Sequence, residues 1–254
     1  MYKLGIDVGG TKIKAILLDN KSKPHFAFNI ATPKNKKAFL KNLESEIKNI
    51  IQKYKISGIG VGLPGIIDMK HGILIKSPNL PFLNNWQARK LFSRFSKNIA
   101  IDNDSRCFLR AEATLDVGHR YKNIVALTIG TGIGGGIMID KKIYCGKNFS
   151  TGEFGHMIID GKKTFEKLGA RKTVLNLKKR NEIIGISVAN LINAFNPEIV
   201  ILGGGGIFSG DIKIKSVKKT ASKFIMSPLA KNTPVVKGKL GENSQAIGAA
   251  LLLK

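Results

Sequence analysis

The N-terminal part of the chain combines apolar runs with one amphipathic stretch. Ile- and Leu-rich runs at 2–8 and 12–19 flank a pair of glycines, an arrangement typical of a β-hairpin whose turn can take positive φ. Residues 25–32, "HFAFNIAT", predict a third strand. In residues 34–54 the apolar positions recur every third or fourth residue, which predicts an amphipathic helix. The run at 56–65, "ISGIGVGLPG", predicts a buried strand that ends in turn residues.

The rest of the chain continues this alternation and partly repeats it. Further strands are predicted at 98–102, 123–130, 131–140, 141–145 and 197–206. Further helices are predicted near 87–96 and at 104–116, 181–196 and 243–253. A hairpin with glycines in its first turn opens each half of the chain, which suggests duplicated halves. Strands that alternate with helices, together with separate hairpins, predict an α/β fold with mixed sheets.

The length and composition allow either one large domain or two smaller ones. The chain has 254 residues, of which 43% are hydrophobic, enough to bury a core. It has no apolar run of membrane-spanning length and no basic leader followed by an apolar stretch, so we expect a cytoplasmic protein without a signal peptide. Cys107 and Cys145 are far apart and form no C-x-x-C pair, which argues against a disulfide framework and a cysteine-rich zinc site.

The formal net charge of +25 is the most extreme feature of the composition. A field of this size attracts polyanions such as nucleic acid, polyphosphate or an anionic membrane. However, 35 of the 42 basic residues are Lys, whereas paired hydrogen bonding to phosphates and bases prefers Arg. The lysines are dispersed, and no nucleic-acid-binding motif is apparent. We therefore expect a solvated basic surface with no specific nucleic-acid partner and no membrane partner; a nucleic-acid-binding role is the alternative.

Three glycine-rich turns, each directly after an apolar run, indicate a chemistry that involves anions. They are "DVGGTK", "GTGIGGG" and "GGGG", at residues 7–12, 130–136 and 203–206. Such turns allow backbone N–H groups to approach a phosphate, although each turn taken singly is equally compatible with a hairpin that needs positive φ. "GGTK" leads into a strand and no G-x-x-x-x-G-K-[ST] motif occurs, so the P-loop class is excluded.

Ordered motifs along nearly the whole chain resemble the ROK family, the repressors, open reading frames and kinases that share the actin-like ATPase fold with hexokinases. The N-terminal motifs are "GIDVGGTKIKAILLD", "GIGVGLPGIID", "SPNLP" and "NDSRCFLRAEA". The C-terminal motifs are "LTIGTGIGGGIMIDKKIYCG", "GEFGHM", "NPEIVILGGG" and "AIGAALL". Because the first phosphate motif starts at residue 5, with no DNA-binding segment ahead of it, the resemblance favours a kinase over a repressor.

The resemblance implies two actin-like (ribonuclease H-like) lobes with mixed β-sheets flanked by helices, and with ATP and sugar in the cleft between them. We expect an N-terminal lobe at 1–105, completed by the C-terminal helix 243–254, and a larger C-terminal lobe at 106–242. The second lobe departs from the family pattern, because its connection around 170–182 is shorter than usual. The oligomeric state is left open, with a homodimer as one option.

The resemblance also implies roles in phosphoryl transfer. Asp104 would be the general base that accepts the proton of a sugar hydroxyl, although Asp is also a preferred helix-capping residue. Asp7 resembles the acidic group that holds Mg²⁺, often through water. ATP would bind the two phosphate turns and the adenosine-side loop, through Gly9, Gly10, Thr11, Lys12, Gly130, Thr131, Gly132, Gly134, Gly203 and Gly204. A plain exposed strand lysine is the alternative for Lys12.

For the sugar, the resemblance implies contacts from Gly65, Asn79, Asn103, Asp104, Glu153, His156 and Glu166. Polar groups suit this task because each sugar hydroxyl both donates and accepts, and an analogue that lacks one leaves a buried partner unpaired. The alternatives are a turn role for Asn79 and a local pair formed by Glu153 and His156.

Two departures from the family pattern change the expected chemistry. Many members follow the signature His with C-x-C-G-x-x-G-C-x-E, which holds zinc, whereas "IIDGKKTFEKL" here has no cysteine, so we predict no zinc. A site built from His156, Asp160 and Glu166 is the less favoured alternative, because it lacks a second nitrogen or sulfur donor. Arg106 replaces the Asn that commonly follows the catalytic segment, and a cation there is expected to weaken Asp104 as a base.

Together these observations predict an ATP-dependent, Mg²⁺-requiring sugar kinase that is similar to glucokinases. The acceptor would be a hexose or N-acetylhexosamine hydroxyl, most simply O6. The alternatives are a glucokinase that uses polyphosphate, which a basic surface suits, and a non-catalytic sugar-binding or sensor protein. The sequence does not specify the sugar.

Overall fold

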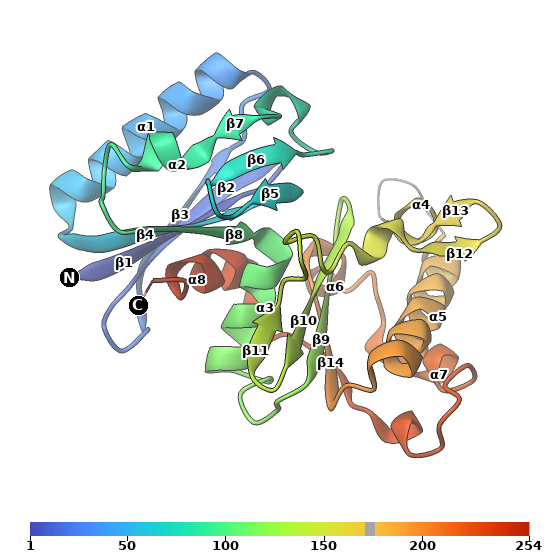
Figure 1. The fold of residues 1–254 in the computed structure, drawn as a ribbon. Helices are drawn as coiled ribbons and strands as arrows, with labels where there is room; N and C mark the ends of the chain where they lie inside the picture. Colours follow the sequence, from blue (N-terminus) through green and yellow to red (C-terminus); the bar gives the residue numbers. More distant parts are fainter. Residues whose placement is uncertain (171–175, 254) are drawn as a thin grey trace. The chain divides into compact units, whose positions relative to one another are not determined.

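The computed structural model describes residues 1–170 and 176–253 (Figure 1). The chain divides into two compact units. Unit 1 comprises Met1–Ala111, Gly146–Ser150 and Asn243–Lys254, and unit 2 comprises Glu112–Cys145 and Thr151–Glu242. The boundary thus falls at 111/112 rather than at 105, and the two units are nearly equal in length, so unit 2 is not the larger one.

Unit 1 is built on a five-stranded mixed sheet with the order β3-β2-β1-β4-β8. Its strands are β1 (Tyr2–Val8), β2 (Lys12–Leu18), β3 (Pro24–Ala31), β4 (Ile56–Leu63) and β8 (Ile99–Asn103). β1, β2 and β3 are antiparallel, as the hairpin pattern predicted, whereas β4 is parallel to β1 and to β8. The predicted α/β fold with mixed sheets is therefore confirmed for this unit.

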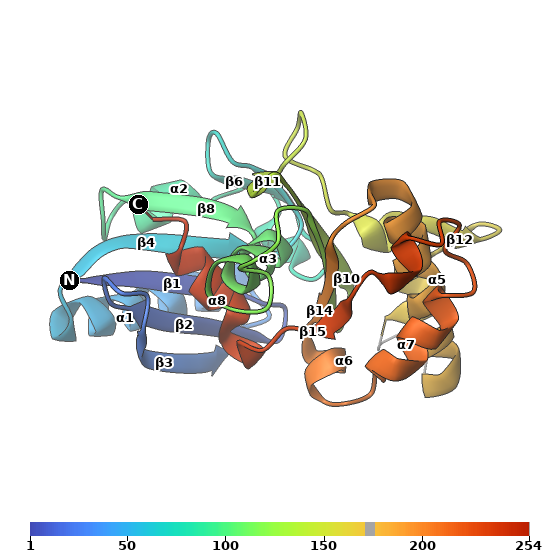
Figure 2. The same cartoon turned by 90° about the horizontal axis from the view of Figure 1, so that it is seen from below.

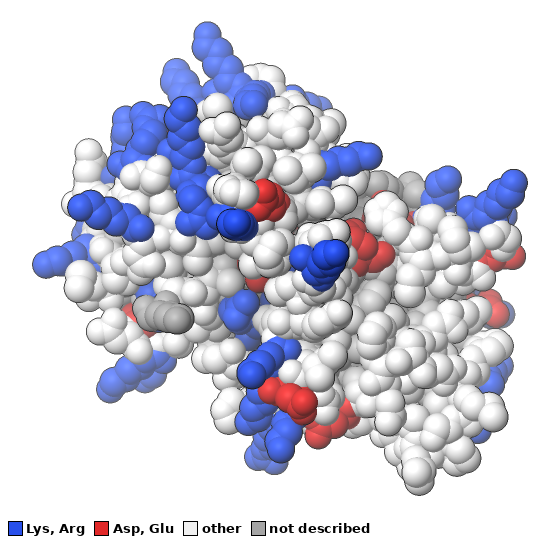
Figure 3. Space-filling model, viewed as in Figure 1, with Lys and Arg blue, Asp and Glu red and all other residues white. Residues whose placement is uncertain are grey.

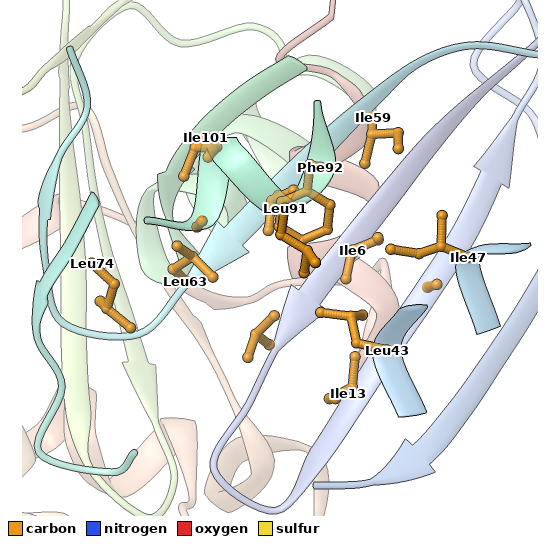
Figure 4. Packing of buried hydrophobic residues seen from close by; sticks show 14 of the residues in the cluster. Ile6, Ile13, Leu43, Ile47, Ile59, Leu63, Leu74, Leu91, Phe92 and Ile101 are labelled. Atoms are coloured by element: carbon orange, nitrogen blue, oxygen red, sulfur yellow. The ribbon is translucent and has the colours of Figure 1, made fainter. Parts of the chain in front are cut away.

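The amphipathic helix predicted at 34–54 is α1 (Lys36–Lys53). It begins after Asn35, whose side chain accepts a hydrogen bond from the Ala38 N–H, as an N-cap residue does. Its buried face packs into the core of unit 1, where Leu43 and Ile47 lie close to Ile6 of β1 (Figure 4). The sequence pattern was sufficient here because one apolar stripe faces one sheet.

The helix at the end of the chain, α8 (Ser244–Ala250), packs against the same sheet (Figure 2). It lies so close to β1 and β4 that a Cβ at Gly5 would overlap the Ala246 carbonyl oxygen, and one at Gly60 the Ala249 carbonyl oxygen. Gly5 and Gly60 are register partners in the parallel pair, so two glycines side by side form the seat for the helix backbone.

The stretch between β4 and β8 holds more regular structure than the sequence pattern indicated. A small antiparallel sheet contains β5 (Ile66–Asp68), β6 (Ile73–Lys76) and β7 (Trp86–Gln87), with the 3-10 helix η1 (Pro81–Leu83) between the last two. The helix predicted near 87–96 is only α2 (Ala88–Phe92). After β8 the chain enters α3 (Asp104–Leu115), which crosses from unit 1 into unit 2.

Unit 2 repeats the topology of unit 1. Its five-stranded sheet has the order β11-β10-β9-β14-β15, from β9 (Ile124–Ile129), β10 (Ile133–Ile139), β11 (Lys142–Tyr144), β14 (Ile199–Gly203) and β15 (Val235–Lys237). The hairpin β9–β10 is antiparallel and β14 is parallel to β9, as β4 is to β1. The duplicated halves suggested by the two glycine hairpins are therefore confirmed.

The remaining elements of unit 2 surround this sheet. They are η2 (Phe154–His156), β12 (Ile158–Asp160), β13 (Lys163–Thr164), α4 (Phe165–Gly169), α5 (Leu177–Phe195), α6 (Gly205–Phe208), α7 (Ile214–Ala221) and η3 (Ala230–Asn232), and η4 (Gly241–Asn243) leads back to unit 1. The predicted short connection around 170–182 lies partly at 171–175, outside the described residues. No helix within the described ranges is long and apolar enough to cross a membrane.

Candidate functional site

The first glycine turn closes the hairpin β1–β2. The Gly9 N–H donates to the Lys12 carbonyl at 3.0 Å, and a Cβ at Gly9 would lie 2.7 Å from that oxygen. Neither Gly9 nor Gly10 has a φ in the left-handed region, so this turn does not use the positive φ that its glycines would allow. Glycine is required here by close backbone approach instead, and the Thr32 hydroxyl fixes the turn by donating to the Gly9 carbonyl at 2.7 Å.

Asp7 and Asp104 both lie close to Gly62 of β4. Asp7 is the penultimate residue of β1 and the register partner of Gly62 on β4, and a Cβ at Gly62 would lie 3.5 Å from the Asp104 Cα. Burial, and after it the charge of Asp104, raise the pKa of Asp7 to about 7 against the opposing charge of Lys14. Two carboxyl groups of unit 1 are thus close enough to influence each other's ionisation.

Asn103, rather than Asp104, caps α3. Its Oδ1 accepts from the N–H of Ser105 at 2.9 Å and of Arg106 at 3.3 Å, while its Nδ2 donates to the Gly65 carbonyl at 3.2 Å. Asp104 is the first helical residue, and its Oδ1 accepts from the Ser105 N–H at 2.7 Å. The amide of Asn103 therefore joins the helix start to the glycine turn after β4 and fixes the backbone that carries Asp104.

The buried side chain of Arg106 joins two segments of the chain through contacts that we call the clasp. Its Nε lies 2.6 Å from Oδ1 of Asp102, and the two side chains are 2% and 0% exposed. The same guanidinium donates from Nη1 to the Phe149 carbonyl at 2.9 Å. Phe149 has a φ of 57°, which is uncommon for a residue other than glycine. The clasp therefore ties the segment Gly146–Ser150 to unit 1, immediately before the chain returns to unit 2.

The loop that carries Asn79 lies against the first glycine turn. A Cβ at Gly10 would lie 3.2 Å from the Asn79 Cβ, and Asn79 itself is exposed. Two residues earlier, Ser77 is 1% exposed, and its hydroxyl has no hydrogen-bond partner among the described residues. The structure thus brings Asn79 close to the turn at 9–12, and it adds a buried hydroxyl that the sequence did not single out.

The second glycine turn and the glycine loop after β14 lie side by side in unit 2. A Cβ at Gly130 would lie 3.7 Å from the Gly205 nitrogen, and a Cβ at Gly204 would come within 2.6 Å of the Ile129 carbonyl oxygen. Gly204 has a φ of 89°, so this is the one glycine of the predicted nucleotide set that needs positive φ. The predicted second phosphate turn and adenosine-side loop are therefore neighbours.

Glu166, one of the residues predicted to contact sugar in unit 2, meets the segment of Glu153 and His156 at the backbone of Ile133. Oε2 of Glu166 accepts from the Ile133 N–H at 2.9 Å, while Gly155 packs against the Ile133 carbonyl so closely that a Cβ would overlap it. Glu153 and His156 flank Gly155, and their charged atoms are 4.0 Å apart with side chains 38% and 66% exposed. Glu166 thus reaches the second glycine turn, and the carboxylate of Glu153 and the imidazole of His156 are open to solvent.

The side chains present fit Mg²⁺ bound mostly through water. Over residues 1–170 and 176–253, no group of three or more His, Cys, Asp or Glu side chains could hold a metal ion. Asp7 offers a single carboxyl group, whose charged form is disfavoured by burial and by Asp104, and a divalent cation would relieve both effects. The absence of zinc stays a prediction.

The predicted site residues thus form two sets. The set in unit 1 contains Asp7, the turn at 9–12, Gly65, Asn79, Asn103 and Asp104, and the set in unit 2 contains the turn at 130–134, Gly203, Gly204, Glu153, His156 and Glu166. Sequence reasoning missed the structural role of Gly62. The signal for it was present, because Gly58, Gly60 and Gly62 alternate along one strand and so leave one face without side chains.

Comparison with known proteins agrees with this arrangement. The pattern of the ROK family matches residues 3–171 and 159–254, so it extends over both units. The chain belongs to the ROK family. The resemblance drawn from the sequence motifs is thereby confirmed, and with it the actin-like α/β fold.

Several relatives in this family are sugar kinases. The N-acetylgalactosamine kinase AgaK of Shewanella sp. (strain ANA-3) is 29% identical over 79% of this chain and 80% of its own length. The N-acetyl-D-glucosamine kinase of Vibrio cholerae is 27% identical over 98% of both chains. A ROK family glucokinase from Streptomyces griseus, solved with glucose and AMPPNP, superposes with a TM-score of 0.90 over 100% of this chain and 99% of its own, at 18% identity.

Proposed function

We propose that the protein is an ATP-dependent, Mg²⁺-requiring kinase that phosphorylates a hexose or N-acetylhexosamine, most simply at O6, with Asp104 as general base. The observation that carries this proposal is the arrangement of Asp7, Gly62 and Asp104 beside the first glycine turn. It places a carboxyl group that would bind a cation, and a second carboxyl group, close to a glycine turn, and these are groups that phosphoryl transfer to an alcohol requires.

The backbone of Asp104 is fixed by its neighbours, which supports the proposed role as base. It starts α3, and its backbone is fixed on one side by the Asn103 cap and on the other by the register of β4 and β8. A positioned carboxylate accepts the proton of the sugar hydroxyl as that oxygen attacks the γ-phosphorus, which avoids a free alkoxide. Mg²⁺, held near Asp7 through water, would neutralise charge on the phosphate oxygens.

The sugar side of the proposal depends on groups with different freedom to act. Asn79, Glu153 and His156 are exposed or half-buried and are able to exchange water for sugar hydroxyls. Asn103 already uses Oδ1 and one N–H in the protein, so its remaining N–H is the group left for a hydroxyl. Glu166 uses Oε2 on Ile133, so a role for Glu166 through its other oxygen is a finer part of the proposal.

The relatives suggest which acceptors to test first. Kinases for N-acetylgalactosamine and N-acetyl-D-glucosamine are among the most similar proteins, and the superposed S. griseus enzyme is a glucokinase. A screen over glucose, mannose and the N-acetylhexosamines, each with ATP and with polyphosphate as donor, identifies both substrates. Sugar binding without transfer from either donor would favour the sensor alternative.

Asp104→Asn tests the proposal directly. We expect kcat to fall by roughly 10²–10⁴-fold, because the amide is close in shape to the carboxylate but is not a proton acceptor, while sugar binding measured by calorimetry is retained. Asp160→Asn is the matched control, since Asp160 is an exposed carboxyl group outside the proposed site. Turnover by Asp104→Asn close to that of the control would exclude Asp104 as the base.

A further inference from the structure

The segment after α7 exposes three large apolar side chains on the surface of unit 2. Phe224 is 52% exposed, Met226 is 86% exposed and Leu229 is 89% exposed, and the last two are the most exposed large hydrophobic residues in the described part of the chain. In Figure 3 the lower right, where the segment after α7 lies in the same view, is largely free of charged groups. This segment has no part in the site proposed above.

The exposed residues are held in place rather than left on a loose loop. Asn193 of α5 donates from Nδ2 to the Phe224 carbonyl at 3.0 Å and accepts at Oδ1 from the Met226 N–H, also at 3.0 Å. Between these two bonds Ile225 is only 5% exposed and packs into the core of unit 2. A buried anchor thus turns its two neighbours outward, and the apolar tip is fixed before any partner arrives.

A basic cavity opens beside the tip. It has a volume of about 380 Å³ and is lined by Lys218, Lys219, Lys231, Ser222, Asn232 and Thr233 over an apolar floor that includes Ile192 and Ile225. Acidic residues are absent from this lining and from the whole of residues 214–235, which carry five lysines. None of Lys218, Lys219 and Lys231 forms an ion pair within the described residues.

We propose that this surface, formed by Phe224, Met226 and Leu229 together with Lys218, Lys219 and Lys231, docks onto an anionic lipid membrane. An apolar tip beside a set of lysines is the combination that binds a membrane surface, because the tip enters the acyl boundary while the ammonium groups meet lipid phosphates. The membrane contact would arise from this one patch rather than from the +25 charge as a whole.

The charges favour this partner over two others. A second copy of the chain would bring the same unpaired lysines together at a two-fold interface, and like charges would oppose that contact. Nucleic acid would match the lysines, but within the tip only Phe224 offers an aromatic face on which bases stack, and the two most exposed side chains, Met226 and Leu229, offer none. An anionic bilayer satisfies both parts of the surface.

Co-sedimentation with lipid vesicles tests the proposal on the full chain. The vesicles are phosphatidylcholine alone, or phosphatidylcholine with about 30 mol% phosphatidylglycerol, at near-physiological salt. We expect binding to the anionic vesicles only, and we expect Met226→Ser/Leu229→Ser and Lys218→Gln/Lys219→Gln/Lys231→Gln each to weaken it by about ten-fold or more. Both sets of positions are exposed, so the variants should fold as the parent does.

Matched controls separate the patch from general charge and hydrophobicity. Ile139→Ser/Ile158→Ser removes two exposed apolar side chains elsewhere in unit 2, and Lys142→Gln/Lys162→Gln/Lys178→Gln removes the same charge elsewhere. Both controls should bind like the parent. Equal binding to neutral vesicles, or equal losses in patch and control variants, would overturn the proposal. So would self-association in light scattering that Met226→Ser/Leu229→Ser abolishes, because the surface would then join two copies.

Discussion

At the scale of single residues, Asp7 is a residue whose ionised form lowers the stability of the fold and which is proposed to hold the cation in phosphoryl transfer. Its carboxyl group is buried beside Asp104, and both the burial and the neighbouring charge disfavour its ionised form. A purely structural position would be better occupied by a neutral residue. A buried carboxyl group whose ionised form is disfavoured is typical of a functional site, and a bound cation would stabilise that ionised form.

The pH dependence of stability reports this unfavourable ionisation. The pKa of Asp7 is about 7 in the folded state against 3.8 as the ordinary value, so between these values the folded protein binds more protons than the unfolded chain. Stability contributed by this group is therefore lost as the pH rises toward 7. Between pH 5.5 and 8 the parent should lose about 2 kcal/mol relative to Asp7→Asn, measured by urea unfolding in Mg²⁺-free buffer. A constant difference between the two proteins would contradict the burial effect.

The structure gives Arg106 a role that the sequence did not indicate. In the sequence it is an extra cation next to the proposed base, and its effect on Asp104 stays a prediction. In the structure its guanidinium joins buried Asp102 to the Phe149 carbonyl, three residues before Gly152 and four before Glu153. A lysine would not reproduce this, because it lacks the planar fork that serves two acceptors at once.

Substitution of Arg106 should therefore affect both stability and sugar recognition. Arg106→Met should cost about 3–5 kcal/mol in urea unfolding, because among the described residues it leaves the buried charge of Asp102 with the 3.3 Å contact to Arg110 as its remaining ion pair, beside a hydrogen bond from the Asn103 N–H. The milder Arg106→Lys should raise KM for the sugar more than KM for ATP, because Phe149 lies on the path to Glu153. Equal changes in both KM values for Arg106→Lys would indicate a structural role alone.

At the scale of elements, glycines decide how closely helices approach the sheet of unit 1. Gly5 and Gly60 seat α8, whereas Gly62, on the same strand as Gly60, faces the start of α3. These are sites of close backbone approach, and none of the three has positive φ. A glycine pattern on a buried strand therefore indicates close packing of a helix as well as the position of turns.

A pair of alanine substitutions tests this distinction. Gly60→Ala should lower the free energy of unfolding by about 3 kcal/mol or more, because its Cβ would overlap the backbone oxygen of Ala249 and the helix would have to move. Gly62→Ala, two residues away, meets its nearest atom at 3.4 Å and should change stability by less than about 1 kcal/mol. Thermal and urea unfolding measure both, and equal losses would contradict the packing described for α8.

At the scale of the whole molecule, two features stand out: a repeated topology and a large positive charge. Each unit contributes an antiparallel hairpin with a glycine turn and a parallel strand beside it, so the glycine turn has an equivalent place in each sheet. The positive charge, by contrast, is not arranged in a repeated pattern, since most of it comes from dispersed lysines. We expect it to act as a general field rather than as a specific nucleic-acid site.

The salt dependence of DNA binding distinguishes general electrostatic attraction from a specific binding site. Binding of a generic DNA duplex, measured by fluorescence anisotropy, should weaken by about 100-fold or more between 50 and 200 mM salt, because release of counterions drives it. Kinase turnover with ATP should change far less over that range. Saturable DNA binding that persists at physiological salt would instead support a nucleic-acid role.

The sequence by itself determined most of the longer strands and helices, the duplicated hairpins and the identity of the glycine turns. It did so because apolar periodicity and turn residues are local, and the family motifs are local as well. It also placed Asp7 correctly within the first strand and Asp104 at the start of one helix. Their closeness to each other was not visible in the sequence.

Only the tertiary structure decided which distant residues meet. The pairing of Arg106 with Phe149, the convergence of Glu166 and Gly155 on Ile133, and the glycine seat for α8 each join residues far apart in the chain. The same holds for Asn193, which turns Met226 outward although the local sequence gives no sign of it. Such contacts depend on how elements pack, and packing is set by side chains and backbone from several segments at once.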